Sequence, residues 1–541
     1  GRGARARLAG LSRMLRRAPR ELWLVFLLKL LESYAYFSLS QVLTIFLSEE
    51  YHLSDRQAGL VYGVYGALVS VYGMILGSCV DRLGVRASLI VGFAISLVSR
   101  FLLAVADARW LLYANLFLAL PVAGAMGIPV MVVAVRRFTE EQNRGFAMGI
   151  FYCMMNIGAL LCGPMIDFLT LSTGNHDDAG QAQPHAHVVD AHPGVAAVLT
   201  GNRRVLMSCA LASGLGLIVS LKGLGDPRLD PPGRNATNGK GERGGQCAQL
   251  SRLAKDPTFL RFFAFSLLMV NLRGVFRHLD ATLPKYLVRT HGPAVNKGLI
   301  YAINPAVIIL CVPLVTAVTS HIDSFKMIIL GGYVSATSAC YLIFSDSIAA
   351  SMAFVLQLSL GEALWSPRFL DYQVSVAPEG KEAAFMALAS APLFLSKLPV
   401  GFFSGYLLQR FCPPSPRCVP GMSTCAEWVK LGLATCAAQF CSSCPGDMAG
   451  GCSAYCGECR VGSTGCADRW VTCPPEPNRD SGSMWLWITL TTLASPILVH
   501  ALARFIREPS HASAGYRQVP RSVSFDKADD LSMDLDGHIG I

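Results

Sequence analysis

The chain has 541 residues, of which 52% are hydrophobic and only 15% are charged, and its formal net charge is +10. Its mean hydropathy is positive, at +0.43. Soluble proteins carry about 25% charged residues, so this composition excludes a soluble multidomain protein and predicts a chain embedded in a lipid bilayer.

The first twenty residues are strongly basic, with seven arginines and no acidic residue, and an apolar stretch follows from Leu22. Positive charge beside a span is retained in the cytoplasm, so we interpret residues 1–21 as a cytoplasmic N-terminus. The alternative is an organelle transit peptide, which is also rich in arginine and poor in acids. Because the basic residues directly precede a span, we expect no nucleic-acid partner.

Long apolar stretches recur along the whole chain, and a helix needs about 20 mainly apolar residues to cross the hydrocarbon core. The sequence predicts an all-α membrane protein of twelve transmembrane helices in two six-helix halves, with a Cys-rich extracytoplasmic loop. We expect a multi-pass protein of the plasma membrane or an organelle membrane, with both termini cytoplasmic. The predicted spans are 22–47, 57–80, 87–106, 110–134, 145–171, 204–222, 258–287, 297–320, 326–346, 348–375, 382–409 and 483–505.

The segments between the predicted spans are polar and divide the chain. Residues 81–86 are expected to form a short cytoplasmic connection, and the polar C-terminal tail is expected to be disordered. The predicted organisation is a basic N-terminus (1–21), an N-terminal six-helix half (22–222), a cytoplasmic linker (223–257), helices 7–11 of the C-terminal half (258–410), a Cys-rich extracytoplasmic loop (411–482), helix 12 (483–505) and a cytoplasmic tail (506–541).

Eleven of the eighteen cysteines lie between Cys412 and Cys473. This density predicts a small module held by disulfides in an oxidising compartment, with one cysteine left over. The alternative is zinc, because residues 441–444 and 456–459 form two Cys-x-x-Cys pairs. We interpret the loop as an accessory cap and as a possible surface for an extracytoplasmic partner.

The end of the second predicted span carries a charged, glycine-containing motif, GSCVDRLGVR at residues 77–86. Glycine permits close helix approach, and an Asp-Arg pair can latch one conformation shut. The motif resembles the signature between the second and third helices of the major facilitator superfamily, and the resemblance extends over nearly the whole membrane domain. It implies a transporter fold with a gating role for Gly77, Asp81, Arg82, Gly84 and Arg86.

Two further stretches resemble the proton-coupled oligopeptide transporter branch of that superfamily. Residues 144–158 (RGFAMGIFYCMMNIG) resemble its fifth helix, and residues 361–391 resemble its tenth and eleventh helices. This resemblance implies that Glu362 meets the amino group of a substrate. The first helix departs from the branch: in place of its Glu-x-x-Glu-Arg cluster the chain has Lys29, Glu32 and Ser33. A divergent member with a different cargo is therefore expected.

Ionisable side chains lie inside several predicted spans, and each costs at least about 2.5 kcal/mol near a helix centre. Two sets, Lys29 with Glu32 and Arg277 with Asp280, are spaced to pair within one helix, which would make them purely structural. In the resembled fold the first, seventh and tenth helices line a central cavity, so we favour a pathway role. The candidate substrate-binding residues are Tyr34, Tyr36, Arg273, Arg277, Glu362 and Lys397, and the candidate proton-coupling residues are Lys29, Glu32, Asp280 and Glu362.

These features together predict a secondary active transporter, in which two halves rock around a site at the middle of the membrane. The expected partners are protons, the lipid bilayer and a small polar or anionic solute such as a peptide, an amino acid or a carboxylate. The alternative is a receptor or sensor, or a subunit of a membrane complex, that kept the fold without turnover and uses the Cys-rich loop. No enzymatic motif falls where it could work, so no enzyme activity, cofactor or metal is expected.

Overall fold

The structure, a computed structural model, describes residues 18–139, 144–171, 199–224, 257–319, 321–376, 396–414 and 478–506, and no strand occurs within these ranges. Residues 1–17, most of the predicted linker, nearly all of the Cys-rich loop and the tail after residue 506 lie outside them. Cys412 is the one cysteine of that loop in the described part, and its thiol is free and buried.

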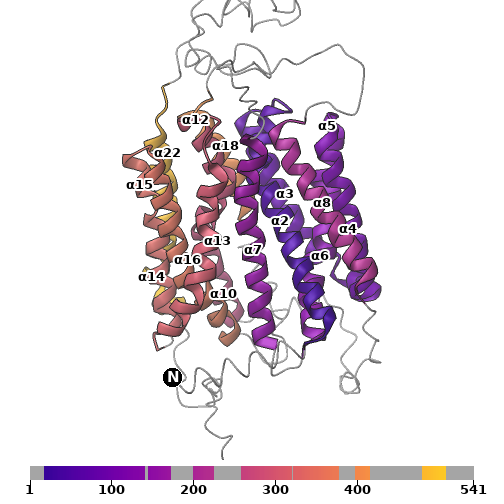
Figure 1. The fold of residues 1–541 in the computed structure, drawn as a ribbon. Coiled ribbons are helices and arrows are strands. Elements are labelled where there is room, and N and C mark those ends of the chain that lie inside the picture. Colours follow the sequence, from indigo (N-terminus) through magenta and orange to yellow (C-terminus); the bar gives the residue numbers. More distant parts are fainter. Residues whose placement is uncertain are drawn as a thin grey trace, which may run out of the picture.

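The N-terminal helix set runs from α2 to α8, and its helices lie side by side in the indigo-to-magenta part of the bundle (Figure 1). Five residues of π-helix, η1, interrupt its fourth long segment between α5 and α6. The elements are α2 (Arg20–Glu49), α3 (Asp55–Ile75), α4 (Gly77–Val105), α5 (Arg109–Ala114), η1 (Asn115–Ala119), α6 (Leu120–Arg137), α7 (Arg144–Leu171) and α8 (Gly201–Lys222).

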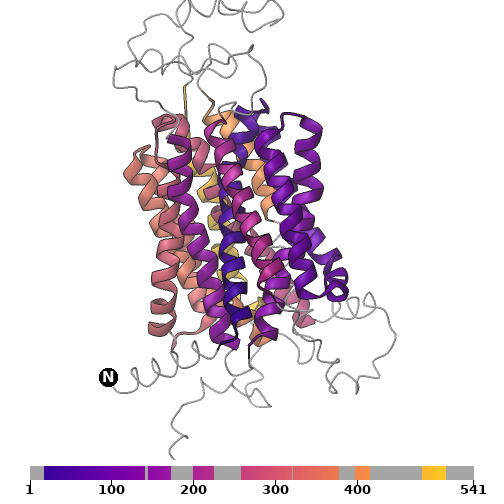
Figure 2. The same cartoon turned by 45° about the vertical axis from the view of Figure 1, so that its right-hand side comes forward.

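The C-terminal helix set runs from α10 to α23 and packs against the first set along α7 and α13, as both views of the bundle show (Figures 1 and 2). Its elements are α10 (Pro257–Leu268), α11 (Val270–Ala281), α12 (Leu283–His291), α13 (Lys297–Val318), α14 (Ser324–Thr337), α15 (Cys340–Phe344), α16 (Ile348–Val376), α18 (Lys397–Phe411), α22 (Ser481–Ala501) and α23 (Ala503–Ile506).

The described residues contain nine helical segments that are long and apolar enough to cross a membrane, and ten if the bent pair α10–α11 counts as one span. This confirms a multi-pass integral membrane protein. Two of the twelve predicted spans are not among these ten. One corresponds to α3, and the other to α18, whose described part has only 15 residues.

The structure refines two predicted boundaries. The predicted connection 81–86 contains a kink at Gly84, where two helical stretches of α4 (Gly77–Val105) meet, and the candidate membrane span begins at Leu83. Gly84 has φ 79° and ψ 170°, a conformation that glycine adopts without a steric penalty. The seventh predicted span is not one helix but three, because the backbone leaves the helical path at Met269 and again at Thr282, shortly before Pro284.

The two helix sets touch through backbone at two glycine pairs. A Cβ atom added to Gly59 of α3 would lie 2.2 Å from the carbonyl oxygen of Gly401 in α18. A Cβ atom added to Gly163 of α7 would lie 2.3 Å from the carbonyl oxygen of Gly298 in α13. Small residues that let backbones approach are the usual basis of helix packing in membranes, so these crossings fix the distance between the two sets.

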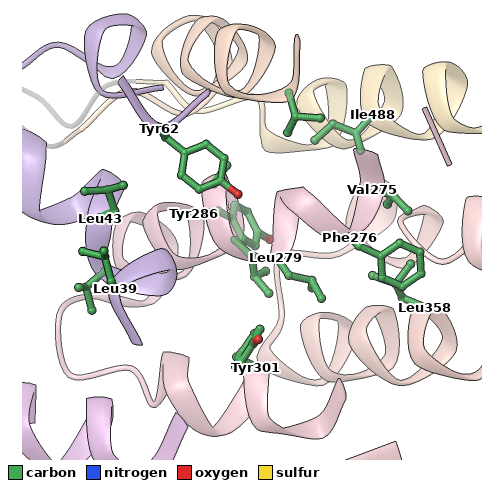
Figure 3. Packing of buried hydrophobic residues seen from close by; sticks show 14 of the residues in the cluster. Leu39, Leu43, Tyr62, Val275, Phe276, Leu279, Tyr286, Tyr301, Leu358 and Ile488 are labelled. Atoms are coloured by element: carbon green, nitrogen blue, oxygen red, sulfur yellow. The ribbon is translucent and has the colours of Figure 1, made fainter. Parts of the chain in front are cut away.

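The apolar core is continuous across the two helix sets. Leu39 and Leu43 of α2 and Tyr62 of α3 face Leu279 of α11 in one buried cluster (Figure 3). The same cluster continues to Ile488 of α22. The polar groups described below are therefore surrounded by apolar side chains, which makes each unpaired charge costly.

Candidate functional site

Helix α11 carries three of the predicted site residues on a segment of twelve residues. Arg273, Arg277 and Asp280 are spaced by four and three positions, so they lie on one face of the helix. That face is directed toward α2 and α3, because Asp280 bonds to both helices. The segment thus presents two guanidinium groups and one carboxylate at the meeting surface of the two helix sets.

The Asp280 carboxylate links the two helix sets. It accepts hydrogen bonds from Ser40 Oγ at 2.9 Å and Gln41 Nε2 at 2.8 Å, both on α2. The Tyr62 hydroxyl of α3 donates a third at 3.3 Å, and Arg277 Nη1 lies 3.8 Å away. Three neutral donors and one cation hold this carboxylate, which matches the three or four acceptor positions that an ionised carboxylate offers.

Lys397, the first residue of α18, lies against two tyrosines, Tyr36 of α2 and Tyr62 of α3. Its ammonium donates a 2.6 Å hydrogen bond to the Tyr36 hydroxyl and lies 4.8 Å from that ring centroid. It is also 5.2 Å from the Tyr62 ring centroid. Within the described ranges no carboxylate lies within 4.0 Å of this buried ammonium. Two aromatic faces and one hydroxyl stabilise the cation and leave its full charge available to an anion.

Gly66 of α3 makes room for Lys397. A Cβ atom added to Gly66 would lie 2.3 Å from Lys397 Cδ and 2.7 Å from Lys397 Cβ, which is too close for any side chain. The ammonium therefore depends on this glycine for its position between the tyrosines.

We expect Gly66→Ala to displace the Lys397 ammonium and to raise the KM for an anionic solute about tenfold, the change that follows from losing about 1.4 kcal/mol of binding. Uptake kinetics in proteoliposomes measure this. The matched control is Gly73→Ala on the same helix, where an added Cβ atom meets nothing within 4 Å. An unchanged KM in Gly66→Ala would show that Lys397 contributes nothing to binding.

The Glu362 carboxylate of α16 forms the second charged group of the site. Arg273 Nη1 lies 3.9 Å from Glu362 Oε1, and Asn304 of α13 donates a 3.1 Å hydrogen bond to Oε2. The Arg273 guanidinium lies 6.0 Å from the centroid of the Trp365 ring. The side chains of Arg273 and Glu362 remain 31% and 14% exposed. This long, open ion pair leaves both groups accessible to a solute.

Lys29 and Glu32 form a separate pair on α2. Their charged atoms are 3.1 Å apart, and the ammonium lies 5.5 Å from the Phe151 ring centroid of α7. The predicted intrahelical pairing is therefore present. At 1.5 Å per residue, Lys29 lies about 16 Å along the helix from Ser40, so this pair and the Asp280 carboxylate occupy different levels of the bundle.

The remaining predicted residues lie elsewhere. The Tyr34 hydroxyl is bonded at 2.8 Å to Ser208 of α8, within the N-terminal set, and is not brought together with the cations. Of the predicted gating residues, Arg86 donates a 3.0 Å hydrogen bond to the Leu221 carbonyl and Gly84 interrupts α4. Gly77 begins α4, and the side chains of Asp81 and Arg82 lie outside the described part of the chain.

The end of the bundle where α2 ends and α3 begins, called here the closed end, contains an ion cluster that the sequence did not predict. Asp55 of α3 accepts hydrogen bonds from Lys285 at 2.7 Å and from Arg289 at 2.9 and 2.8 Å, both on α12. All three side chains are at most 10% exposed. Since α3 and α12 belong to different helix sets, this cluster holds the sets together at the closed end.

A second bond crosses the sets at the same end. The Asp167 carboxylate of α7 accepts hydrogen bonds from the backbone N–H groups of Gly298 and Leu299, each at 2.8 Å. These N–H groups belong to the first turn of α13, where they have no partner within the helix. Asp167 thus caps a helix of the opposite set, a role that its position within one span does not indicate.

Sequence reasoning also missed Ser40, Gln41 and Asn304. The adjacent polar pair at positions 40 and 41 inside an apolar span was the available signal, because a buried polar group needs a partner. Their actual partners, Asp280 and Glu362, are 240, 239 and 58 residues away. Spacing along one helix cannot identify such contacts.

A bundle of apolar helices that encloses charged groups between two packed helix sets is the architecture of a polytopic integral membrane protein. The sequence profile of the Major Facilitator Superfamily matches residues 25–396. The chain belongs to this superfamily, which confirms the prediction from the motif at residues 77–86.

Solved structures agree with this assignment at the level of the fold. One is a POT family transporter in complex with 5-aminolevulinic acid, with a TM-score of 0.61, 13% identity, and coverage of 91% of this chain and 97% of that chain. Another is a peptide transporter POT in complex with sulfate, with a TM-score of 0.58, 14% identity, and coverage of 90% and 95%. At the level of sequence, no curated protein matches the chain significantly.

Proposed function

We propose that the chain is a proton-coupled secondary active transporter of a small solute that carries a negative charge, such as a carboxylate, an amino acid or a peptide. The observation that carries this proposal is the charge of the site. Arg273, Arg277 and Lys397 supply three cations, whereas Asp280 and Glu362 supply two carboxylates, and Asp280 is already bonded to three neutral donors. A buried excess of positive charge needs an anion to neutralise it.

The arrangement suits a solute with two ends. A carboxylate bound between Arg277 and Lys397 would lie beside Tyr36, whose hydroxyl accepts a hydrogen bond from the Lys397 ammonium, and beside the Tyr62 ring, whose centroid is 5.2 Å from it. An amino group would approach Glu362, whose pairing with Arg273 is long and open. The structural neighbours bind ligands of related chemistry, namely 5-aminolevulinic acid and sulfate, which supports an anion-binding site in this fold.

For proton coupling we propose Glu362 as the principal carrier, with Asp280 and the Lys29–Glu32 pair as secondary candidates. Glu362 combines partial exposure with a nearby cation, so its proton can exchange with the pathway while cargo competes for Arg273. Asp280 is buried and bonded between the helix sets, so its protonation would weaken the bonds to Ser40 and Gln41. Such coupling between protonation and contacts across the sets is what symport requires.

For the membrane topology we propose twelve spans in two six-helix halves, with α3 and α18 as the two additional spans. Both lie within the bundle and pack against each other at Gly59 and Gly401. We propose that the closed end faces outward and that both termini are cytoplasmic, with residues 223–257 as the linker and residues 411–482 as the extracytoplasmic loop. The bonds of Asp55 and Asp167 across the sets then close the outer side of an alternating-access pathway.

The test is uptake into proteoliposomes containing the purified full chain. The solutes are dipeptides, amino acids and organic anions, each with and without an inward proton gradient and in competition with the uncharged amide of the same skeleton. We expect gradient-driven accumulation of carboxylates and no inhibition by the amides. Inhibition by the amides as strong as by the acids would contradict the anion site. No uptake of any solute by folded protein would favour a receptor, a sensor or a complex subunit.

A further inference from the structure

The bend between α10 and α11 has a specific cause in the neighbouring helix α22. The axes of Phe259–Leu268 and Val270–Ala281 differ by 41°. The hydroxyl of Ser495 accepts a hydrogen bond from the Leu272 N–H at 3.1 Å and donates one to the Leu268 carbonyl oxygen. In an unbroken α-helix these two backbone groups bond to each other, because the N–H of residue i binds the carbonyl of residue i−4.

The Ser495 hydroxyl is therefore inserted into one backbone hydrogen bond of another helix. A side chain that enters the ladder in this way is a known cause of a sharp kink. Neither backbone group loses a partner, which is necessary because an unbonded amide in a membrane interior costs several kcal/mol. Ser495 is 1% exposed, so no solvent competes for these bonds.

Helix α14 packs against the region around Ser495. A Cβ atom added to Gly332 of α14 would lie 3.3 Å from Pro496 Cβ and 3.4 Å from Leu272 Cδ2. Helix α14 thus contacts both the residue after Ser495 and the residue that its hydroxyl binds. The break is therefore enclosed by α14 and α22.

The segment that follows the break carries the charged face of the site. Arg273 comes directly after Leu272, and Asp280 follows within the same twelve residues. Over the roughly 16 Å between Met269 and Asp280, straightening a 41° bend would move the far end by roughly 10 Å. Asp280 then could not reach Ser40 and Gln41 while α10 kept its place, so the bend and the bonds across the sets depend on each other.

We propose that Ser495 is a positioning residue of the solute site: its hydroxyl holds the bend that directs Arg273 and Arg277 at the solute and Asp280 at α2. The consequences of this inference for transport rest on the proposed function of that site. The bend and its cause do not depend on that function. Both hydrogen bonds of the Ser495 hydroxyl to the α10–α11 segment are made to backbone atoms, so its effect on the solute is transmitted through the placement of α11.

The first measurement is the structure of the full chain in nanodiscs, as wild type and as Ser495→Ala. Alanine leaves the Leu272 N–H free to bond directly to the Leu268 carbonyl, and we expect the bend to fall below about 20°. Ser495→Thr keeps the hydroxyl and should keep the bend. The matched control is Thr492→Val, which removes a buried hydroxyl of α22 that bonds only to its own helix, at Ile488.

The second measurement is transport. We expect Ser495→Ala to raise the KM for an anionic solute about tenfold, with Ser495→Thr close to wild type. The double variant Ser495→Ala, Arg273→Gln should have the same KM as whichever single variant has the higher KM, because the effects of residues that act through one another do not add. Additive effects would mean that Ser495 affects the protein without acting through Arg273.

The outcomes separate this inference from the function on which it rests. If Ser495→Ala retains a bend near 41°, the inference is wrong whatever the transport data show. If the wild type moves no solute, the proposed function fails while the comparison of bends still decides the role of Ser495. Should Ser495→Ala fail to fold, Ser495→Cys keeps the volume with a weak donor and acceptor, and a wild-type KM and bend in that variant would contradict the role of the hydrogen bonds.

Discussion

Glu362→Gln is expected to abolish the accumulation of solute against its gradient while leaving the exchange of a carboxylate that has no amino group intact. Glutamine preserves the shape of the side chain and can still accept the hydrogen bond from Asn304, but it cannot bind and release a proton. It also frees Arg273 from its only acidic partner among the described residues. The proton-driven step is therefore lost, and binding of an anion is not.

Two assays on the same vesicles check this prediction: uptake driven by an inward proton gradient, and counterflow of the labelled carboxylate at equal pH. We expect the first to fall to the level of empty vesicles and the second to remain within about threefold of wild type. Glu32→Gln is the discriminating variant, because Glu32 is the other partly exposed candidate acid and is already paired with Lys29. If Glu32→Gln alone abolishes accumulation, the proton carrier is Glu32 rather than Glu362.

Asp55→Asn is expected to open the closed end of the bundle. The substitution removes the ion-pair partner of the buried Lys285 and Arg289, and removing one partner of a buried ion pair typically costs about 3–5 kcal/mol. Opening this end of the bundle hydrates the two cations and removes this free-energy cost. The substitution therefore destabilises the closed conformation and not the open one. The conformational equilibrium should shift by at least about a hundredfold toward a state that is open at this end of the bundle, and net transport should be lost.

Hydrogen exchange of the full chain in nanodiscs measures this shift without labels. We expect faster exchange in peptides from α12 and from the first turn of α13, where the N–H groups of Gly298 and Leu299 would lose the Asp167 carboxylate. The matched control is Glu50→Gln, which breaks an ion pair to Arg203 at the same end but inside the N-terminal set. Unchanged exchange in Asp55→Asn, or equal changes in both variants, would rule out Asp55 as a gate between the sets.

The sequence by itself determined the class of protein. A charge content of 15% and long apolar stretches require a bilayer, and the motif at residues 77–86 was sufficient to indicate the superfamily. The same spacing rules correctly paired Lys29 with Glu32, because residues three apart on one helix are neighbours whatever surrounds them. These properties are local, or depend only on composition, and so they can be obtained from one chain without its structure.

Contacts between helices were decided only by the tertiary structure. The spacing of Arg277 and Asp280 predicted an intrahelical pair, which is present at 3.8 Å, but the closer partners of Asp280 are Ser40 and Gln41 on α2. Asp55 and Arg289 are 234 residues apart, and nothing in either local sequence indicates the other. The bend before Arg273 likewise depends on a serine more than 220 residues away. A buried charge specifies that it needs a partner, but only the packing of one helix against another determines which residue that partner is.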